Sequence, residues 1–271
     1  MKFVYDHDLH IHSKLSSCSK DERQTPTRIL QYAQDNGLNT VCVTDHLWDD
    51  AVESYTDRGD YKTQNFAHIL QSKPLPTATG IRFLFGCETE MDQVLTIGLS
   101  KARHKDLDFI IIPTTHMHMQ GFTISEADGA TAKTRAAAWV RRLNAVLNAD
   151  LPFHKVGLAH LTCGHIARQR EVCLDTINSI SNDDLARLFK RAGELGVGIE
   201  LNAHDMGFAD EEADVILRPY RIAKEFGCKF YCGSDAHTPE GFAYAKNFAR
   251  AIDLLALDEA DKFRVEDKLK S

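Results

Sequence analysis

Short runs of valine, isoleucine, leucine and phenylalanine recur along the chain, and longer stretches with helical spacing separate them. These runs are apolar throughout rather than alternating, which is typical of strands buried on both faces of a parallel sheet. They predict seven strands, over residues 3–5, 40–43, 82–86, 109–112, 156–159, 197–201 and 229–232.

The intervals between the runs carry signals of helix starts. Thr25 followed by Pro26 has the chemistry of an N-cap and a first helical residue. Ser181, with Asp184 three residues later, resembles a capping box ahead of an apolar helical stripe. Helices are therefore predicted over residues 25–37, 130–147, 181–196 and 211–226. The polar segment 49–76 is expected to form loops and a short helix over one end of the molecule.

The regular alternation of strands and helices implies βαβ units and therefore a parallel sheet. Seven such units in 271 residues favour a closed barrel over an open sheet. No linker rich in proline or glycine divides the chain, and the sequence contains no internal repeat. We therefore expect a single α/β domain over residues 1–271.

The composition narrows the class of protein. The chain has 32 lysine and arginine residues against 39 aspartate and glutamate residues, a net charge of −7, and no basic block, which argues against a nucleic-acid partner. No apolar run approaches the ~20 residues needed to cross a bilayer, and the first residues turn polar too soon for a secretory signal. Seven scattered cysteines do not suggest a disulfide framework. These features predict a cytoplasmic protein with reduced thiols and no membrane partner.

The 13 histidines give the strongest clue, because each predicted strand runs into a histidine or a carboxylate. In chain order these strand-end residues are His10 and His12, Asp45 and His46, Glu88, His116 and His118, His160, Glu200 with Asn202, and Asp235 with His237. In α/β barrels the carboxyl ends of the strands meet at one mouth, so these side chains are expected to gather there. Because side chains alternate along a strand, His10 and His12 would present two rings on one face as a chelate.

So many polar side chains at one mouth would be costly to bury without bound cations. Mixed imidazole and carboxylate ligands suit zinc, iron or manganese. More than four of them indicate two or more ions that share a bridging carboxylate, an arrangement that activates water and holds the oxygens of a phosphate ester. The sequence therefore predicts a metal-dependent hydrolase, and phosphate-ester hydrolysis is the chemistry best served.

Four motifs, in this order, resemble those of the polymerase and histidinol phosphatase (PHP) family: Asp8-Leu9-His10-Ile11-His12, Thr44-Asp45-His46, Gly86-Cys87-Glu88 and Gly233-Ser234-Asp235-Ala236-His237. The resemblance extends over essentially the whole chain and implies a distorted TIM-like (β/α)7 barrel. It also implies two or three divalent ions of zinc, iron or manganese and the hydrolysis of a small phosphomonoester, with histidinol phosphate as the first candidate. A nucleotide phosphatase or an exonuclease-like phosphodiesterase of the same family is the alternative.

The resemblance further implies which residues bind each ion. The first ion would be bound by His10, His12, Glu88 and Asp235. The second, bridged by Glu88, would be completed by His116 and His160, with His118 as an alternative to His116. The third would be bound by His46 and His237.

Roles in the reaction follow from the same resemblance. A hydroxide between the first two ions would attack phosphorus, which makes Asp235 and His237 the expected catalytic residues. Either His237 or a metal-bound water would protonate the leaving group.

One position departs from the family pattern. The family usually supplies a further histidine to the third ion, eight residues after His10, where this chain has Cys18. A thiolate can replace imidazole on zinc, so a third site that favours zinc is one interpretation. A free Cys18 beside a weak or absent third ion is the other.

Supporting residues are also expected beside the ligands. Asp8 and Asp45 lie beside ligands and are predicted to orient imidazole rings. Glu200 and Asn202, at the end of the strand over 197–201, are predicted to contact ligands or substrate.

For the substrate phosphate, the main candidate is Arg168 in the loop after 156–159, because a guanidinium makes bidentate contacts to phosphate oxygens. Lys14 is a lesser candidate.

Two readings from other classes stay open. Amidohydrolase-type C–N hydrolases also have His-x-His after the first strand, but they normally add a bridging lysine where this chain has Thr114-Thr115-His116. A non-catalytic, metal-stabilised binding scaffold is the other reading, and the loss of a histidine at Cys18 is the feature that supports it.

Overall fold

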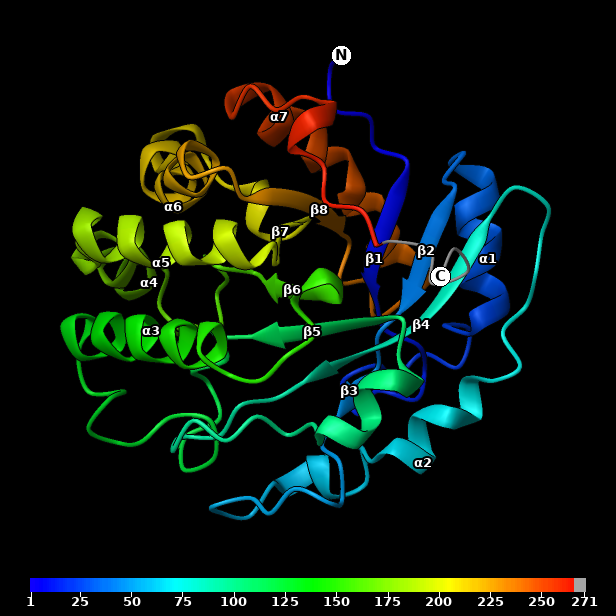
Figure 1. The fold of residues 1–271 in the computed structure, drawn as a ribbon, viewed down its shortest axis with the longest axis horizontal. Helices are drawn as coiled ribbons and strands as arrows, with labels where there is room; N and C mark the ends of the chain where they lie inside the picture. The colour runs from blue at the N-terminus through cyan, green and yellow to red at the C-terminus, as the bar shows by residue number, and fades with distance from the viewer. Residues whose placement is uncertain (266–271) are drawn as a thin grey trace.

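The computed structural model describes residues 1–265, and its strands curl into a nearly closed parallel barrel (Figure 1). The strands are β1 (His7–Ile11), β2 (Thr40–Val43), β3 (His46–Leu47), β4 (Arg82–Thr89), β5 (Phe109–Pro113), β6 (Val156–Ala159), β7 (Gly198–Asn202) and β8 (Lys229–Gly233). Seven of them are neighbours in the order β1-β2-β4-β5-β6-β7-β8, and the two-residue β3 pairs with β4. The predicted α/β barrel is therefore confirmed.

Helices cover the outside of the barrel. They are α1 (Pro26–Asp35), α2 (Phe66–Ile69), α3 (Ala132–Leu147), α4 (Arg170–Ser179), α5 (Asn182–Leu195), α6 (Ala213–Glu225) and α7 (Asn247–Leu254). Helices α3 to α6 form one layer beside β5 to β8, while α1 lies on the other side next to β2 (Figure 1). The expected N-caps are present, since Thr25 accepts a hydrogen bond from the Arg28 N–H at 3.2 Å and Ser181 accepts one from the Asp184 N–H at 3.1 Å.

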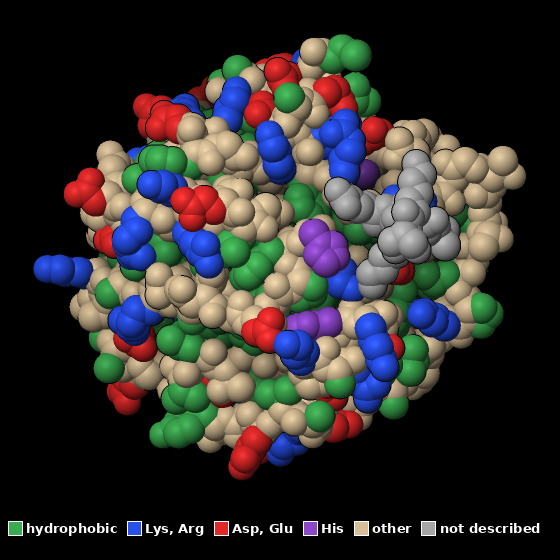
Figure 2. Space-filling view, in the orientation of Figure 1, with side chains coloured by type: hydrophobic (Ala, Val, Ile, Leu, Met, Phe, Trp, Pro, Cys, Tyr) green, Lys and Arg blue, Asp and Glu red, His purple; other side chains and the backbone are tan. Residues whose placement is uncertain are grey.

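Helix length and the distribution of surface charge were compared with the features expected for membrane or nucleic-acid partners. Within residues 1–265, none of the helices combines the length and the apolar character that crossing a bilayer demands. On the face drawn in Figure 2, lysine and arginine side chains are dispersed among acidic and uncharged ones.

The first predicted strand is wrong, and the seam of the barrel explains why. The strand lies at His7–Ile11 rather than at 3–5, so it contains polar residues that a search for apolar runs passes over. Along the seam between β1 and β8, the Cys232 N–H donates to His7 Nε2 at 3.0 Å, and the Ser234 N–H donates to the Asp8 carboxylate at 2.9 Å. Side chains thus replace part of the hydrogen bonding between the two strand backbones. Because His7 and Asp8 are hydrogen-bonded, burying their polar atoms is not strongly destabilising.

An apolar plug fills the barrel below the mouth. It consists of Leu9, Cys42, Leu84, Phe109, Ile111, Ala159, Tyr231 and Phe263. Above it, Arg142 of α3 is only 2% exposed and donates hydrogen bonds to backbone carbonyls in the loops that follow β4 and β5, among them Met91 at 3.1 Å and Thr114 at 2.7 Å. The plug and this arginine hold the strand ends that carry the site.

Candidate metal centre

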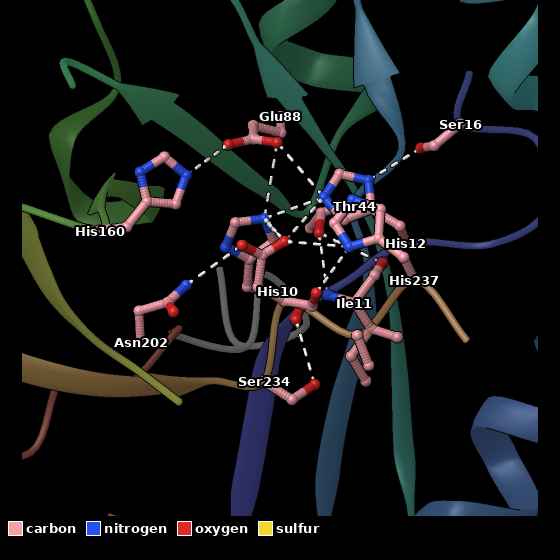
Figure 3. Close-up of polar contacts among 12 residues, drawn as sticks. His10, Ile11, His12, Ser16, Thr44, Glu88, His160, Asn202, Ser234 and His237 are labelled. Carbon is pink, nitrogen blue, oxygen red and sulfur yellow. Dashed lines mark hydrogen bonds and ion pairs between the residues drawn. The ribbon is translucent and has the colours of Figure 1, made fainter. Parts of the chain in front are cut away.

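The mouth of the barrel brings His10 and His12 together with Glu88 of β4 (Figure 3). Asp235, which follows β8, lies beside the same two rings. The Nε2 atoms of the two rings lie 3.1 Å apart. His12 Nε2 is 3.3 Å from an oxygen of Glu88 and 3.3 Å from an oxygen of Asp235. Two ring nitrogens and two carboxylate oxygens therefore face one another in a buried space, where a divalent cation would satisfy all four.

The other oxygen of Glu88 faces a second pair of histidines. Its Oε1 lies 3.1 Å from His160 Nε2 and 4.0 Å from His116 Nε2, and the two rings are stacked with centroids 4.7 Å apart. Glu88 Oε2, by contrast, is the oxygen that faces His10 and His12. The carboxylate of Glu88 thus joins two groups of ligand atoms, which is the arrangement of a bridging ligand.

A third group opens toward solvent. One ligand atom from each of His12, Cys18, His46 and His237 lies within 4.8 Å of the others, and Cys18 Sγ is 3.2 Å from His46 Nε2. The thiol stands at the position where the family resemblance places a histidine. Cys18 therefore lies among the residues expected to hold a third ion.

Each ring of the first two groups has a partner on its far nitrogen. His10 Nδ1 is 2.6 Å from Glu200 Oε1, and His12 Nδ1 is 2.8 Å from Ser16 Oγ. His160 Nδ1 is 3.0 Å from Thr115 Oγ1, and His116 Nδ1 is 2.5 Å from Glu90 Oε1. Such partners fix the tautomer and aim the free nitrogen at a metal.

The predicted supporting residues have different contacts. Asp45 reaches His12 through Ser16, whose hydroxyl donates to Asp45 at 2.7 Å. Asn202 donates to Glu200 and to Asp235, each at 3.3 Å. Asp8 accepts hydrogen bonds from the backbone N–H groups of His10 and Ser234 and from the Tyr32 hydroxyl, the last at 3.1 Å, so its contacts lie at the barrel seam.

Two of the clustered residues have unusual backbones. His160 and Asp235 have φ angles of 31° and 54°, a left-handed region that non-glycine residues rarely adopt. Strain of this kind costs of order 1–3 kcal/mol and is concentrated at functional sites. At these positions His160 Nε2 lies 3.1 Å from Glu88, and an oxygen of Asp235 lies 3.3 Å from His12 Nε2.

The buried rings and carboxylates of the cluster shift one another's pKa. Burial disfavours the charged form of His10, but the carboxylates of Asp235 and Glu200 outweigh it and raise the pKa of His10 well above its usual range. Burial acts to raise the pKa of Glu88, but the rings of His10 and His46 outweigh it and lower that pKa well below its usual range. Because imidazole must be neutral and carboxylate charged to bind a metal, divalent ions would displace these protons.

A cavity of about 690 Å³ lies over the three groups. Its floor includes Glu88, Asp235 and His237, and its wall includes Tyr61, Met119 and Phe122. Two cationic side chains, Lys20 and Arg58, also line it. The cavity is large enough for a small organic substrate.

Neither predicted phosphate ligand lines this cavity. Arg168 is exposed on the loop after β6, and Lys14 forms a 2.6 Å ion pair with Glu22 on the surface. His118 lies at the exposed rim, whereas His116 lies with Glu88 and His160. The reason is that the chain turns after β5, where the Met117 N–H donates to the Thr115 carbonyl at 2.8 Å, so the strand alternation does not continue to His118.

Several residues of the site went unnoticed in the sequence. Glu90 is buried two residues after Glu88, a spacing that could have revealed it, and burial together with the charge of Glu88 raises its pKa to about 7. Tyr61 donates to Glu90 at 2.8 Å and lies 3.0 Å from His46 Nδ1. Tyr61 and Arg58 come from the polar segment 49–76, whose spacing carries no signal of their position.

A nearly closed parallel barrel with clustered histidines and carboxylates at its carboxyl mouth defines a class of metal-binding barrel proteins. Within that class, the model of the PHP domain family matches residues 8–204. The chain belongs to the PHP domain family, as its motifs predicted. No curated protein matches the chain.

Solved structures are similar to the chain to different degrees. Histidinol phosphate phosphatase from Lactococcus lactis subsp. lactis Il1403, solved with zinc, L-histidinol and phosphate, has a TM-score of 0.59 and 14% identity, over 96% of this chain and 99% of that one. A chain of archaeal ribonuclease P, solved with mature tRNA, has a TM-score of 0.40 and 16% identity, over 96% and 97% of the two chains. A Xaa-Pro dipeptidase with bound methionine has a TM-score of 0.41 and 15% identity, over 94% and 71%.

Proposed function

We propose that this protein is a metal-dependent phosphoesterase that hydrolyses a small phosphomonoester, with histidinol phosphate as the first candidate. The observation that carries the proposal is the bridging position of Glu88, whose two oxygens face His12 at 3.3 Å and His160 at 3.1 Å. Membership of the PHP domain family supports the same chemistry. The histidinol phosphate phosphatase with the same fold was solved with zinc and phosphate, which suggests the substrate class.

The residues of the mouth have distinct tasks in this proposal. Divalent ions bound there would activate water and offset the charge of the phosphoryl oxygens. Glu88 would fix the spacing of two ions, because it lies on β4 with neighbours on both sides of the strand. Asp235 and His237 line the cavity beside the cluster, and we place them next to the reacting phosphate.

The cationic lining suits an anionic substrate. Arg58 Nη1 is buried and has no hydrogen-bond partner among the described residues. A buried donor left unpaired is costly, and a phosphate oxygen would satisfy it. We therefore assign the phosphate contact to Arg58, and to Lys20, which lines the same cavity, in place of Arg168 and Lys14.

The test is an activity panel on protein loaded with manganese, zinc or iron. The panel contains histidinol phosphate, other phosphomonoesters, nucleotides, a phosphodiester and an N-acyl amino acid. Release of phosphate from monoesters, absent in Glu88→Ala, is the expected result. Metal-loaded protein that cleaves no phosphate ester would contradict the proposal, and cleavage confined to the N-acyl substrate would support the amidohydrolase reading.

The assignment of Arg58 has its own matched control. Losing a charge-assisted hydrogen bond costs about 1.5–3 kcal/mol, so Arg58→Ala should raise KM for the phosphomonoester roughly 10- to 100-fold. Arg168→Ala removes the same side chain outside the cavity and should leave KM unchanged. Equal effects of the two substitutions would refute the assignment.

A further inference from the structure

The third group of ligand atoms differs chemically from the other two. The groups around Glu88 offer imidazole nitrogen and carboxylate oxygen, whereas the third contains the sulfur of Cys18. Cys18, His46 and His237 all line the cavity. The other six cysteines are buried and belong to none of the three groups among the described residues.

The rings of this group are aimed by contacts on their far nitrogens. His46 Nδ1 lies 3.0 Å from the Tyr61 hydroxyl, and its Nε2 faces Cys18 Sγ at 3.2 Å. His237 Nδ1 lies 2.7 Å from the Asp235 carbonyl oxygen, to which its N–H donates, so Nε2 is the nitrogen with a lone pair for an ion. His12 Nε2 already faces Glu88 and Asp235, and His46 Nδ1 lies 3.1 Å from Glu88 Oε2. Cys18 Sγ, His46 Nε2 and the Nε2 of His237 are therefore the atoms left to hold an ion in this group.

We propose that Cys18, His46 and His237 form a thiolate site for a third ion, and that this site accepts zinc or cobalt but discriminates against manganese. The proposal rests on the metal centre of the proposed function. Thiolate ligands select zinc, while imidazole and carboxylate ligands also suit manganese. On binding, the Cys18 thiol loses its proton to solvent and the sulfur forms the bond to the ion, so no oxidant or reductant is needed.

Two consequences separate this site from a free cysteine. A chain saturated with zinc should hold one ion more than a chain saturated with manganese. Cobalt in the site should also give a thiolate-to-cobalt charge-transfer band in the near ultraviolet, which imidazole and carboxylate ligands do not give.

The experiment titrates metal-free protein with cobalt and measures metal content after saturation with zinc or manganese. The wild type should show the band, and Cys18→Ser should lose both the band and one zinc per chain. Cys18→His should lose the band, keep the zinc and gain one manganese. Cys228→Ser is the matched control, because its buried sulfur donates to the Phe189 carbonyl far along the chain from the cluster and its loss should change neither readout.

The proposal is overturned if the wild type shows no thiolate band, if the band persists in Cys18→Ser, or if zinc and manganese saturate wild type to equal content. Circular dichroism of Cys18→Ser and Cys18→His checks that each variant is folded. Failure of the proposed function looks different, since phosphate-ester hydrolysis would then be missing whatever the cobalt spectrum shows.

Discussion

Glu200→Gln tests whether the contacts of Glu200 with His10 and His160 control the affinity of the site for metal. Glu200 is fully buried, and its Oε1 lies 2.6 Å from His10 Nδ1. Its Oε2 accepts hydrogen bonds from the His160 N–H at 2.7 Å and from the Asn202 amide at 3.3 Å. Glutamine has the same shape but only one acceptor oxygen, so its NH₂ group must face either His10 or the donors of His160 and Asn202.

The expected magnitude follows from these contacts. At least one charge-assisted hydrogen bond is lost, which is worth about 1.5–3 kcal/mol. A loss of that size corresponds to roughly 10- to 100-fold in an equilibrium constant. Because His10 and His160 belong to different ion groups, we expect zinc affinity to fall by this factor in at least one of them.

The assay is competition for zinc between the protein and a chromophoric chelator of known affinity. Glu211→Gln, an exposed glutamate on the surface, is the control and should match the wild type. Circular dichroism establishes that both variants are folded. Zinc affinity of Glu200→Gln within twofold of the wild type would refute the idea that Glu200 holds these ligands in place.

Further predictions concern the ligands, the packing around them and the stability of the mouth. His10→Ala or Glu88→Ala should remove bound metal and hydrolysis while circular dichroism shows an intact barrel, and full turnover by either variant would contradict the site. In Gly233→Ala the new Cβ would clash with Glu200 Oε1, the oxygen that contacts His10 Nδ1. We therefore expect weaker zinc binding in the same chelator assay, and wild-type affinity would show that zinc binding does not depend on the contact between Glu200 and His10. Burial raises the pKa of Asp205 from 3.8 to about 7, so ionisation of its carboxyl destabilises the fold as pH rises through this range, by at most about 4 kcal/mol. Asp205→Asn should therefore raise the melting temperature of metal-free protein at pH 8 but hardly at pH 4, and a lower value at pH 8 would contradict this.

Continuous apolar runs predicted the fold well. The strands over 40–43 and 156–159 coincide with β2 and β6, because buried parallel strands are short and apolar. The first strand was misplaced, because His7 and Asp8 are polar yet buried, and their partners Cys232 and Ser234 come from the other end of the chain.

Within the site, residues at strand ends were predictable from the sequence and residues on loops were not. Strand polarity alone brings residues such as His10, Glu88 and His160 to one mouth, since all parallel strands of a barrel end on the same side. Loops follow no period, so Arg58 could not be placed over the mouth from the sequence, nor could Arg168 be placed outside it.

The order of residues within single strands was therefore enough to predict the barrel, the family and the type of side chain at each strand end. The three-dimensional packing was needed to show which oxygen of Glu88 faces which histidines. It also showed that Glu90 contacts His116, that Tyr61 contacts His46, and that Cys18 lies in the third group. Such contacts join segments that are distant in the chain, and their geometry is set by how loops and strand ends pack above the apolar plug.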